Sequence, residues 1–265
     1  MYRRIAATLA VALVLPVVAA GAERMTDEQV KKLIEDIDDG YRTWRQDLEK
    51  EKLDDAVIRS AERTINVKDF LKDFDQDIDQ LKDRFTPSYA ASPEVISLLR
   101  RGSDVELRNR RQNLTPRSAW TTLSAKLASL AGAYALRFPV ENMNAQGARL
   151  NDGELATRVQ QAEKAFKQLR GDTDKAAKAN KAIDKATRES LKGSIRQLGQ
   201  SAKEVRTRIK EARPASVEAG QLLSQTGKVK ETLTRLSLPS AAGPSWRGIE
   251  SGAAALARAF DLPKP

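Results

Sequence analysis

Apolar residues separated alternately by four and three positions recur along this chain, and this spacing constrains its fold more than any other feature. A helix turns once every 3.6 residues, so such a series lines one helical face. Three series of six follow the pattern: Val30, Ile34, Ile37, Tyr41, Trp44 and Leu48; Val67, Leu71, Phe74, Ile78, Leu81 and Phe85; and Leu191, Ile195, Leu198, Ala202, Val205 and Ile209. Because each series is short, we expect an elongated all-α helical bundle with short coiled-coil-like seams and no sheet.

The composition favours slender helices over a thick core. Alanine, the strongest helix former, accounts for 38 of the 265 residues, whereas aromatic residues make up 5%. Charged residues make up 31% of the chain. We see no repeat with a period of 20–50 residues, which argues against a helical solenoid.

Proline, glycine and capping residues divide the chain into five expected segments. These are a signal peptide (1–22), an acidic helical hairpin (23–86), short helices and a loop (87–150), a basic long-helix region (151–238), and an Ala/Gly/Ser-rich tail with room for one short helix (239–265). Thr26 with Gln29 and Asn151 with Glu154 form capping-box patterns, and Asn66 is a further helix start.

Several boundaries follow from single residues. We expect Gly102 to end a helix that starts at Ser92–Pro93, and residues 103–113 to form a partly ordered connection. Thr115–Pro116 is expected to start the next helix, which ends at Pro139. Gly171–Asp172 is expected to break the long helical region. Leu53–Thr64 is either a connecting helix or a bent continuation of the first.

The first 22 residues have the pattern of a secretory signal peptide. Arg3 and Arg4 precede an apolar stretch, and Ala20 and Ala22 occupy the −3 and −1 positions of a cleavage site before Glu23. We therefore expect an exported protein of the bacterial periplasm or the extracellular space. The alternative is an uncleaved anchor, since residues 5–22 are just long enough to span a bilayer. Pro16 and the small residues that end the stretch favour cleavage, which leaves a mature chain without a transmembrane span.

The chain contains neither cysteine nor histidine. Disulfides, thiol nucleophiles, Ser-His-Asp triads and Cys/His zinc sites are therefore excluded. We expect no cofactor and no enzymatic activity. The run Asp73, Asp75, Asp77 and Asp79 has the alternation of a calcium loop, but Ile78 stands where glycine is needed and Arg84 where a bidentate carboxylate is needed. A solvated helical face is expected there, and no metal site.

Charge is distributed unevenly. Residues 23–85 contain 13 Lys and Arg against 19 Asp and Glu, whereas residues 86–265 contain 31 against 17. Such asymmetry favours attraction between the two parts, within or between molecules, or a basic surface for anionic partners.

A series of cations in the basic region is the one surface with a candidate role. The residues are Lys178, Lys181, Lys185, Arg188, Lys192 and Arg196, which would share one face of a continuous helix. Export argues against nucleic acid and favours an anionic envelope polymer or lipid headgroups, whereas the simpler alternative is a solvated helix face. Trp44 and Trp120 lie on apolar seams, and Trp246 either docks the tail or anchors a partner.

These features favour a non-enzymatic structural or adaptor protein of the cell envelope that acts through protein partners or self-association. The alternative is a periplasmic chaperone-like or anionic-surface-binding protein that uses its basic helix face. The adaptor hypothesis predicts one or a few stoichiometric partners, and the chaperone hypothesis predicts weak binding to many unfolded clients.

Overall fold

A computed structural model describes residues 23–59, 64–112, 117–142, 144–238 and 243–264. The expected signal peptide and the start at Thr115–Pro116 lie outside these residues. The elements are α1 (Asp27–Lys50), β1 (Val57–Arg59), β2 (Thr64–Asn66), α2 (Val67–Arg84), α3 (Ser92–Gln112), α4 (Arg117–Ala133), α5 (Asp152–Ala179), α6 (Lys185–Lys210), α7 (Ser216–Arg235) and α8 (Pro244–Ala259). The expected all-α fold is confirmed.

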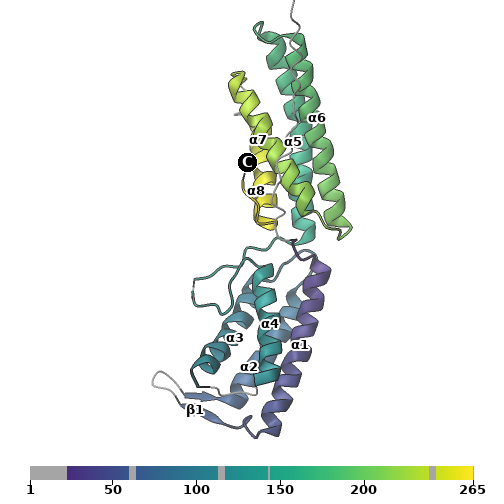
Figure 1. The fold of residues 1–265 in the computed structure, drawn as a ribbon. Helices are drawn as coiled ribbons and strands as arrows, with labels where there is room; N and C mark the ends of the chain where they lie inside the picture. Colours follow the sequence, from purple (N-terminus) through teal and green to yellow (C-terminus); the bar gives the residue numbers. More distant parts are fainter. Residues whose placement is uncertain (1–22, 60–63, 113–116, 143, 239–242, 265) are drawn as a thin grey trace, which may run out of the picture.

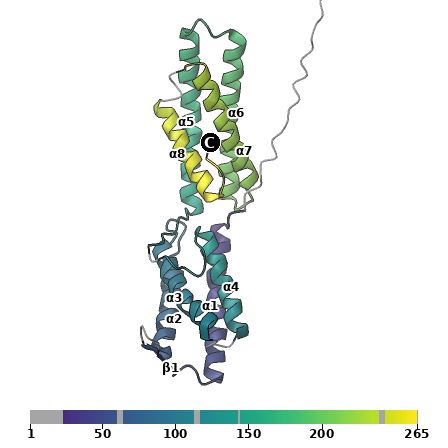
Figure 2. The ribbon, with the colours of Figure 1, turned by 60° about the vertical axis from the view of Figure 1, so that its left-hand side comes forward.

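The helices form two four-helix bundles stacked end to end (Figures 1 and 2). In the first bundle α1 packs against α2 and α4, and α3 packs against α2 and α4. In the second bundle α5 packs against α6 and α8, and α7 packs against α6 and α8. Each bundle has its own hydrophobic core, and Gly/Ala/Ser-rich residues 243–264 complete the second one as the docked helix α8. The aromatic rings of Trp44, Trp120 and Trp246 are all buried.

A short hairpin corrects the expectation of no sheet. Strands β1 and β2 pair antiparallel at the far end of the first bundle, with Ile58 opposite Ile65. The hairpin also replaces the helix considered for Leu53–Thr64. Val57, Ile58, Thr64 and Ile65 are β-branched, and such residues favour strands over helices.

Two expected helix boundaries are wrong because the helices continue through the glycines that were expected to end them. Helix α3 continues through Gly102 to Gln112, so residues 103–112 are helical and do not form a partly ordered connection. A Cβ atom at Gly102 would lie 2.6 Å from Leu127 Cδ1, so this glycine permits close packing of α3 on α4. Helix α5 likewise continues through Gly171, which faces open space. The actual turn follows at residues 180–184.

The predicted capping residues are confirmed. Thr26 and Gln29 form a capping box at α1, and Asn151 and Glu154 form one at α5. Asn66 accepts hydrogen bonds from the first turn of α2. Helix α4 ends at Ala133, before the expected Pro139.

The two bundles are repeats of one another in sequence as well as in topology. Residues 24–30 (RMTDEQV) resemble residues 149–155 (RLNDGEL): arginine and aspartate are identical, and the second and last residues are apolar in both. Asp27 and Asp152 within them lie 125 positions apart. With nearly the same spacing, the buried series that starts at Val67 in α2 corresponds to the series that starts at Leu191 in α6. A period of about 125 residues lies outside the 20–50 considered from the sequence.

Ion pairs around a buried carboxylate follow the same repeat. Each bundle has a buried carboxylate on its first helix, paired with a cation one turn later and with a cation of its second helix. These groups are Asp38, Arg42 and Lys82 in the first bundle and Glu163, Lys167 and Arg206 in the second. A further pair joins the second helix to the third: Arg84 with Glu94 in the first bundle and Arg208 with Glu218 in the second. Each bundle therefore has the same arrangement of ion pairs among its first three helices.

Candidate functional site

The joint between the bundles is built from the first residues of α1 and α5, which start there and run in opposite directions (Figure 1). Asp27 Oδ2 accepts a hydrogen bond from the backbone N–H of Asp152 at 2.7 Å. Asp152 Oδ2 accepts one in return from the backbone N–H of Asp27 at 2.8 Å. Each helix thus supplies a carboxylate to the positive N-terminal end of the other.

Two arginines complete this exchange. Arg24, from the segment before α1, pairs with Asp152, and Arg149, from the segment before α5, pairs with Asp27 at 2.6 Å. The Arg149 side chain is 1% exposed, and its guanidinium lies over the ring of Tyr134. Burial, and secondly the nearby charge of Arg24, lower the pKa of Arg149. The carboxylate of Asp27 opposes both effects, which keeps this buried cation paired.

Glu23 adds a third contact across the joint. Its carboxylate accepts hydrogen bonds from the backbone N–H of Ala215 at 3.0 Å and from the Ser216 hydroxyl at 2.6 Å. Ala215, the N-cap of α7, has no capping side chain of its own. The residue that follows the expected cleavage site therefore caps a helix of the second bundle.

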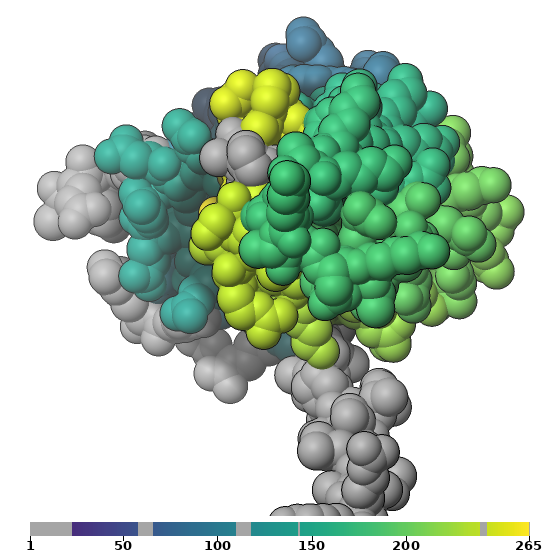
Figure 3. Space-filling view, turned by 90° about the horizontal axis from the view of Figure 1, so that it is seen from above, coloured from purple at the N-terminus to yellow at the C-terminus, as the bar shows by residue number. Residues whose placement is uncertain are grey.

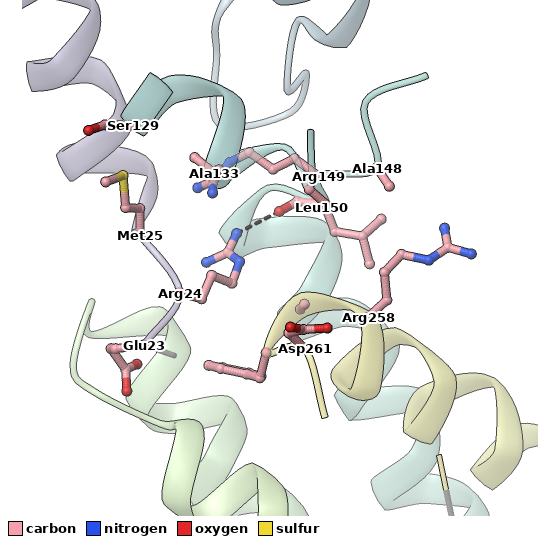
Figure 4. Close-up of a pocket in the computed structure, with 14 residues that line it drawn as sticks. Glu23, Arg24, Met25, Ser129, Ala133, Ala148, Arg149, Leu150, Arg258 and Asp261 are labelled. Atoms are coloured by element: carbon pink, nitrogen blue, oxygen red, sulfur yellow. Dashed lines mark hydrogen bonds between the residues drawn. The ribbon is translucent and has the colours of Figure 1, made fainter. Parts of the chain in front are cut away.

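A cavity of about 500 Å³ lies in the joint, lined by residues of both bundles (Figure 4). Arg258 of α8 and Asp261, just beyond it, line the cavity together with Glu23, Arg24 and Arg149. In Figure 4, Arg24 donates to the carbonyl of Leu150. Three cations and two carboxylates thus line the cavity, and two of the cations, Arg24 and Arg149, are paired with carboxylates of the joint.

The cations of the predicted basic face do not share one helix. Lys178 is in α5, Lys181 is in the turn, and the other four are in α6. The series breaks because the chain reverses between Asn180 and Asp184, where the side chain of Asp184 accepts from Thr187 N–H at the start of α6. The geometry predicted from a continuous helix is therefore wrong, whereas binding of anions by these residues stays a prediction.

Lys178, Lys181 and Lys185 instead lie at the α5–α6 turn, and the other three cations follow along α6. This turn is at the end of the molecule farthest from the joint, the end that faces the viewer in Figure 3. Asp174 pairs with Lys178 at 2.7 Å. The pKa of Asp174 is lowered by its hydrogen bond with Lys178 and by the charges of Lys178, Lys192 and Arg188. Cations from both helices thus meet around one carboxylate, which partly neutralises them.

No cluster of acidic side chains that could hold a metal ion is found among the described residues. The run Asp73–Asp79 lies within α2, as predicted from its apolar neighbours. In the part of the chain that the structure describes, no helix combines the length and apolarity that crossing a membrane requires.

The sequence interpretation missed the joint, although its signal was present. Residues 24–29 and 149–154 both have the pattern Arg-x-x-Asp-x-Glu/Gln, at the start of a helix. Neither segment alone indicates a contact, and only the repetition of the pattern suggests that the two segments meet. Comparisons with protein-family models, curated proteins and solved structures find no match to this chain.

Proposed function

We propose that this chain is an exported, non-enzymatic adaptor of the cell envelope that acts through protein–protein contacts. Export rests on the N-terminal pattern of residues 1–22. The adaptor role rests mainly on one observation: two bundles of the same architecture, held end to end by a paired joint, differ sharply in charge. Residues 23–148 contain 21 Lys and Arg against 23 Asp and Glu, and residues 149–265 contain 23 against 13.

This difference lets the two ends select different partners. Electrostatic complementarity directs association and rejects partners of like charge. The second bundle, with a net charge of +10 from the counts above, is suited to an acidic partner. The joint uses its carboxylates and guanidiniums for internal pairing, which supports a structural role over a catalytic one.

The test is crosslinking in living cells, followed by purification of the tagged protein from the envelope and identification of the attached proteins. We expect one or a few partners in near-equal amount, and a purified chain whose mass shows that it starts at Glu23. A broad set of unfolded clients would contradict the adaptor role and favour the chaperone-like alternative.

A further inference from the structure

A cleft of about 330 Å³ lies between α5 and α6 of the second bundle. Two buried apolar residues, Phe166 and Ile195, line it, and Gly199 leaves it open because it lacks a side chain. Four cations also line it: Lys167, Arg170, Arg196 and Lys203. Its one carboxylate, Glu163, already has two ion-pair partners.

Most of these cations have no internal partner. Lys167 pairs with Glu163 at 3.3 Å, although its side chain remains 68% exposed. Arg170, Arg196 and Lys203 are exposed, and no carboxylate among the described residues pairs with them. The cleft therefore presents an excess of positive charge around a small apolar base.

The equivalent face of the first bundle has carboxylates that the cleft lacks. In the repeat, Lys72 of α2 corresponds to Arg196, whereas Asp75 and Asp79 correspond to Gly199 and Lys203. The cations on the first helix are shared, since Arg42 and Arg45 correspond to Lys167 and Arg170.

The negative charge of Asp75 interacts with one of the cations that both bundles have. The pKa of Arg45 is raised by its hydrogen bond with Glu49 and also by the charge of Asp75. The first bundle thus has a carboxylate of its second helix near a shared cation, at the position where the second bundle has Gly199.

We propose that the α5–α6 cleft binds an acidic helical segment of a protein partner, whose carboxylates take the places that Asp75 and Asp79 hold in the first bundle. Those two residues lie four positions apart, on successive turns of one helix face. A concave site with apolar side chains at its base suits protruding side chains better than a flat lipid surface. This inference rests on the proposed adaptor function and names the partner's chemistry.

The probe is a fluorescein-labelled, alanine-based helical peptide with aspartates four positions apart, and the readout is fluorescence anisotropy with the chain that starts at Glu23. We expect saturable binding of one peptide per chain, weakened by salt. The double variant Gly199→Asp/Lys203→Asp restores the carboxylates of the first bundle, and we expect it to bind about tenfold more weakly. A Cβ at Gly199 would lie 3.7 Å from Phe166 Cβ, so the variant fits sterically.

A matched control changes the net charge of the chain by the same amount at positions outside the cleft. Gln221 and Lys228 are exposed on α7, outside the cleft. We expect Gln221→Asp/Lys228→Asp to bind within about twofold of the unchanged chain. An equal loss in this control would overturn the proposal in favour of general charge attraction.

The reverse exchange tests the same idea by gain of function. Asp75→Ala/Asp79→Lys removes the internal carboxylates of the first bundle, so we expect it to raise the stoichiometry from one peptide to two. Circular dichroism checks that this variant remains helical. A stoichiometry that stays at one in a folded variant would count against the comparison between the bundles.

Two other occupants of the cleft, lipid headgroups and a second copy of the chain, would give different results. Cleft-dependent binding to phosphatidylglycerol–phosphatidylcholine vesicles, without peptide binding, would overturn the proposal in favour of lipid headgroups. Self-association of the chain alone, abolished by Gly199→Asp/Lys203→Asp, would overturn it in favour of a second copy. Peptide binding that depends on the cleft, without any stoichiometric partner in cells, would support the cleft while contradicting the adaptor function.

Discussion

At the scale of single residues, Glu23 stabilises a helix whose N-cap lies 192 positions later in the chain. Its carboxylate accepts from backbone N–H groups of Ala215 and Ser216, which α7 itself leaves without a capping side chain. Loss of an N-cap typically costs about 1 kcal/mol. We therefore expect Glu23→Ala to lower the free energy of unfolding by about 1 kcal/mol, measured by urea denaturation of the chain that starts at Glu23.

The control is Glu231→Ala, which removes an exposed carboxylate from the same helix far from the joint. We expect it to change the free energy of unfolding by less than about 0.5 kcal/mol. Equal stability of Glu23→Ala and the unchanged chain would mean that Glu23 does not cap α7 in solution.

Tyr41 makes the free energy of unfolding depend on pH in the alkaline range. Burial, and secondly the charge of Asp75, raise its pKa from 10.0 to about 12. The folded state therefore holds the phenolic proton more tightly than the unfolded state. The contribution of Tyr41 to the free energy of unfolding is complete below pH 10. It is lost as the pH rises toward 12, at up to about 1.4 kcal/mol per pH unit. Urea denaturation between pH 9 and pH 11.5 measures this fall.

Tyr41→Phe is the matched variant, because phenylalanine occupies the equivalent position 166 in the second bundle. It removes the hydrogen bond from the Tyr41 hydroxyl to the carbonyl of Leu71, so we expect a loss of about 1 kcal/mol at pH 7. The variant is expected to lose stability less steeply above pH 10. Burial also raises the pKa of Tyr134 and of Tyr89, and the hydrogen bond with Asp38 raises the pKa of Lys82, so these groups contribute to the remaining slope. An unchanged slope would contradict the assignment to Tyr41.

At the scale of helices, Gly102 and Gly171 lie inside continuous helices but differ in their surroundings. Alanine at Gly102 would place its Cβ 2.6 Å from Leu127, and such overpacking costs about 1–3 kcal/mol. Alanine at Gly171 meets nothing within 4 Å and favours the helix by about 0.5–1 kcal/mol. We therefore expect opposite shifts in thermal midpoint, measured by circular dichroism. Shifts in the same direction would contradict this account of the two glycines.

The same two glycines show the limit of prediction from the sequence. The apolar series and caps were sufficient to predict most helices, because spacing and capping are local properties. A glycine that ends a helix and a glycine that admits a neighbouring helix look alike in sequence, since both are defined by the missing side chain. The turn between Asn180 and Asp184 contains neither proline nor glycine, so the break in the basic face was not visible.

At the scale of the whole molecule, the joint has the form of a two-fold interface within one chain. Asp27 contacts the segment of Asp152, and Asp152 contacts the equivalent segment of Asp27, as in the interface of a symmetric dimer. Local patterns could not predict this contact, because its partners lie 125 positions apart. Comparing the heptapeptides that start at Arg24 and Arg149 would have suggested it, since equivalent segments of two repeats can meet around a common axis.

The joint should fix the relative orientation of the bundles, and its carboxylates can be tested without disturbing either core. Asp27→Asn/Asp152→Asn keeps the shape of both side chains but removes the charges that pair with Arg24 and Arg149. Breaking a buried pair leaves an uncompensated buried cation, which is costly. We therefore expect the bundles to separate at the joint while their helices remain folded.

Distances between spin labels measure this directly, because the chain has no cysteine of its own. Asp39→Cys and Lys164→Cys place one label at an exposed, equivalent position in each bundle. We expect a narrow distance distribution with the intact joint and a broad one in the Asp27→Asn/Asp152→Asn variant. Asp69→Asn/Glu231→Gln removes exposed carboxylates far from the joint and is expected to leave the distribution narrow. A broad distribution with the joint intact would mean that the two ends move independently. The adaptor function that we propose would then be that of a flexible tether, because only a fixed joint can hold two partners at a set distance.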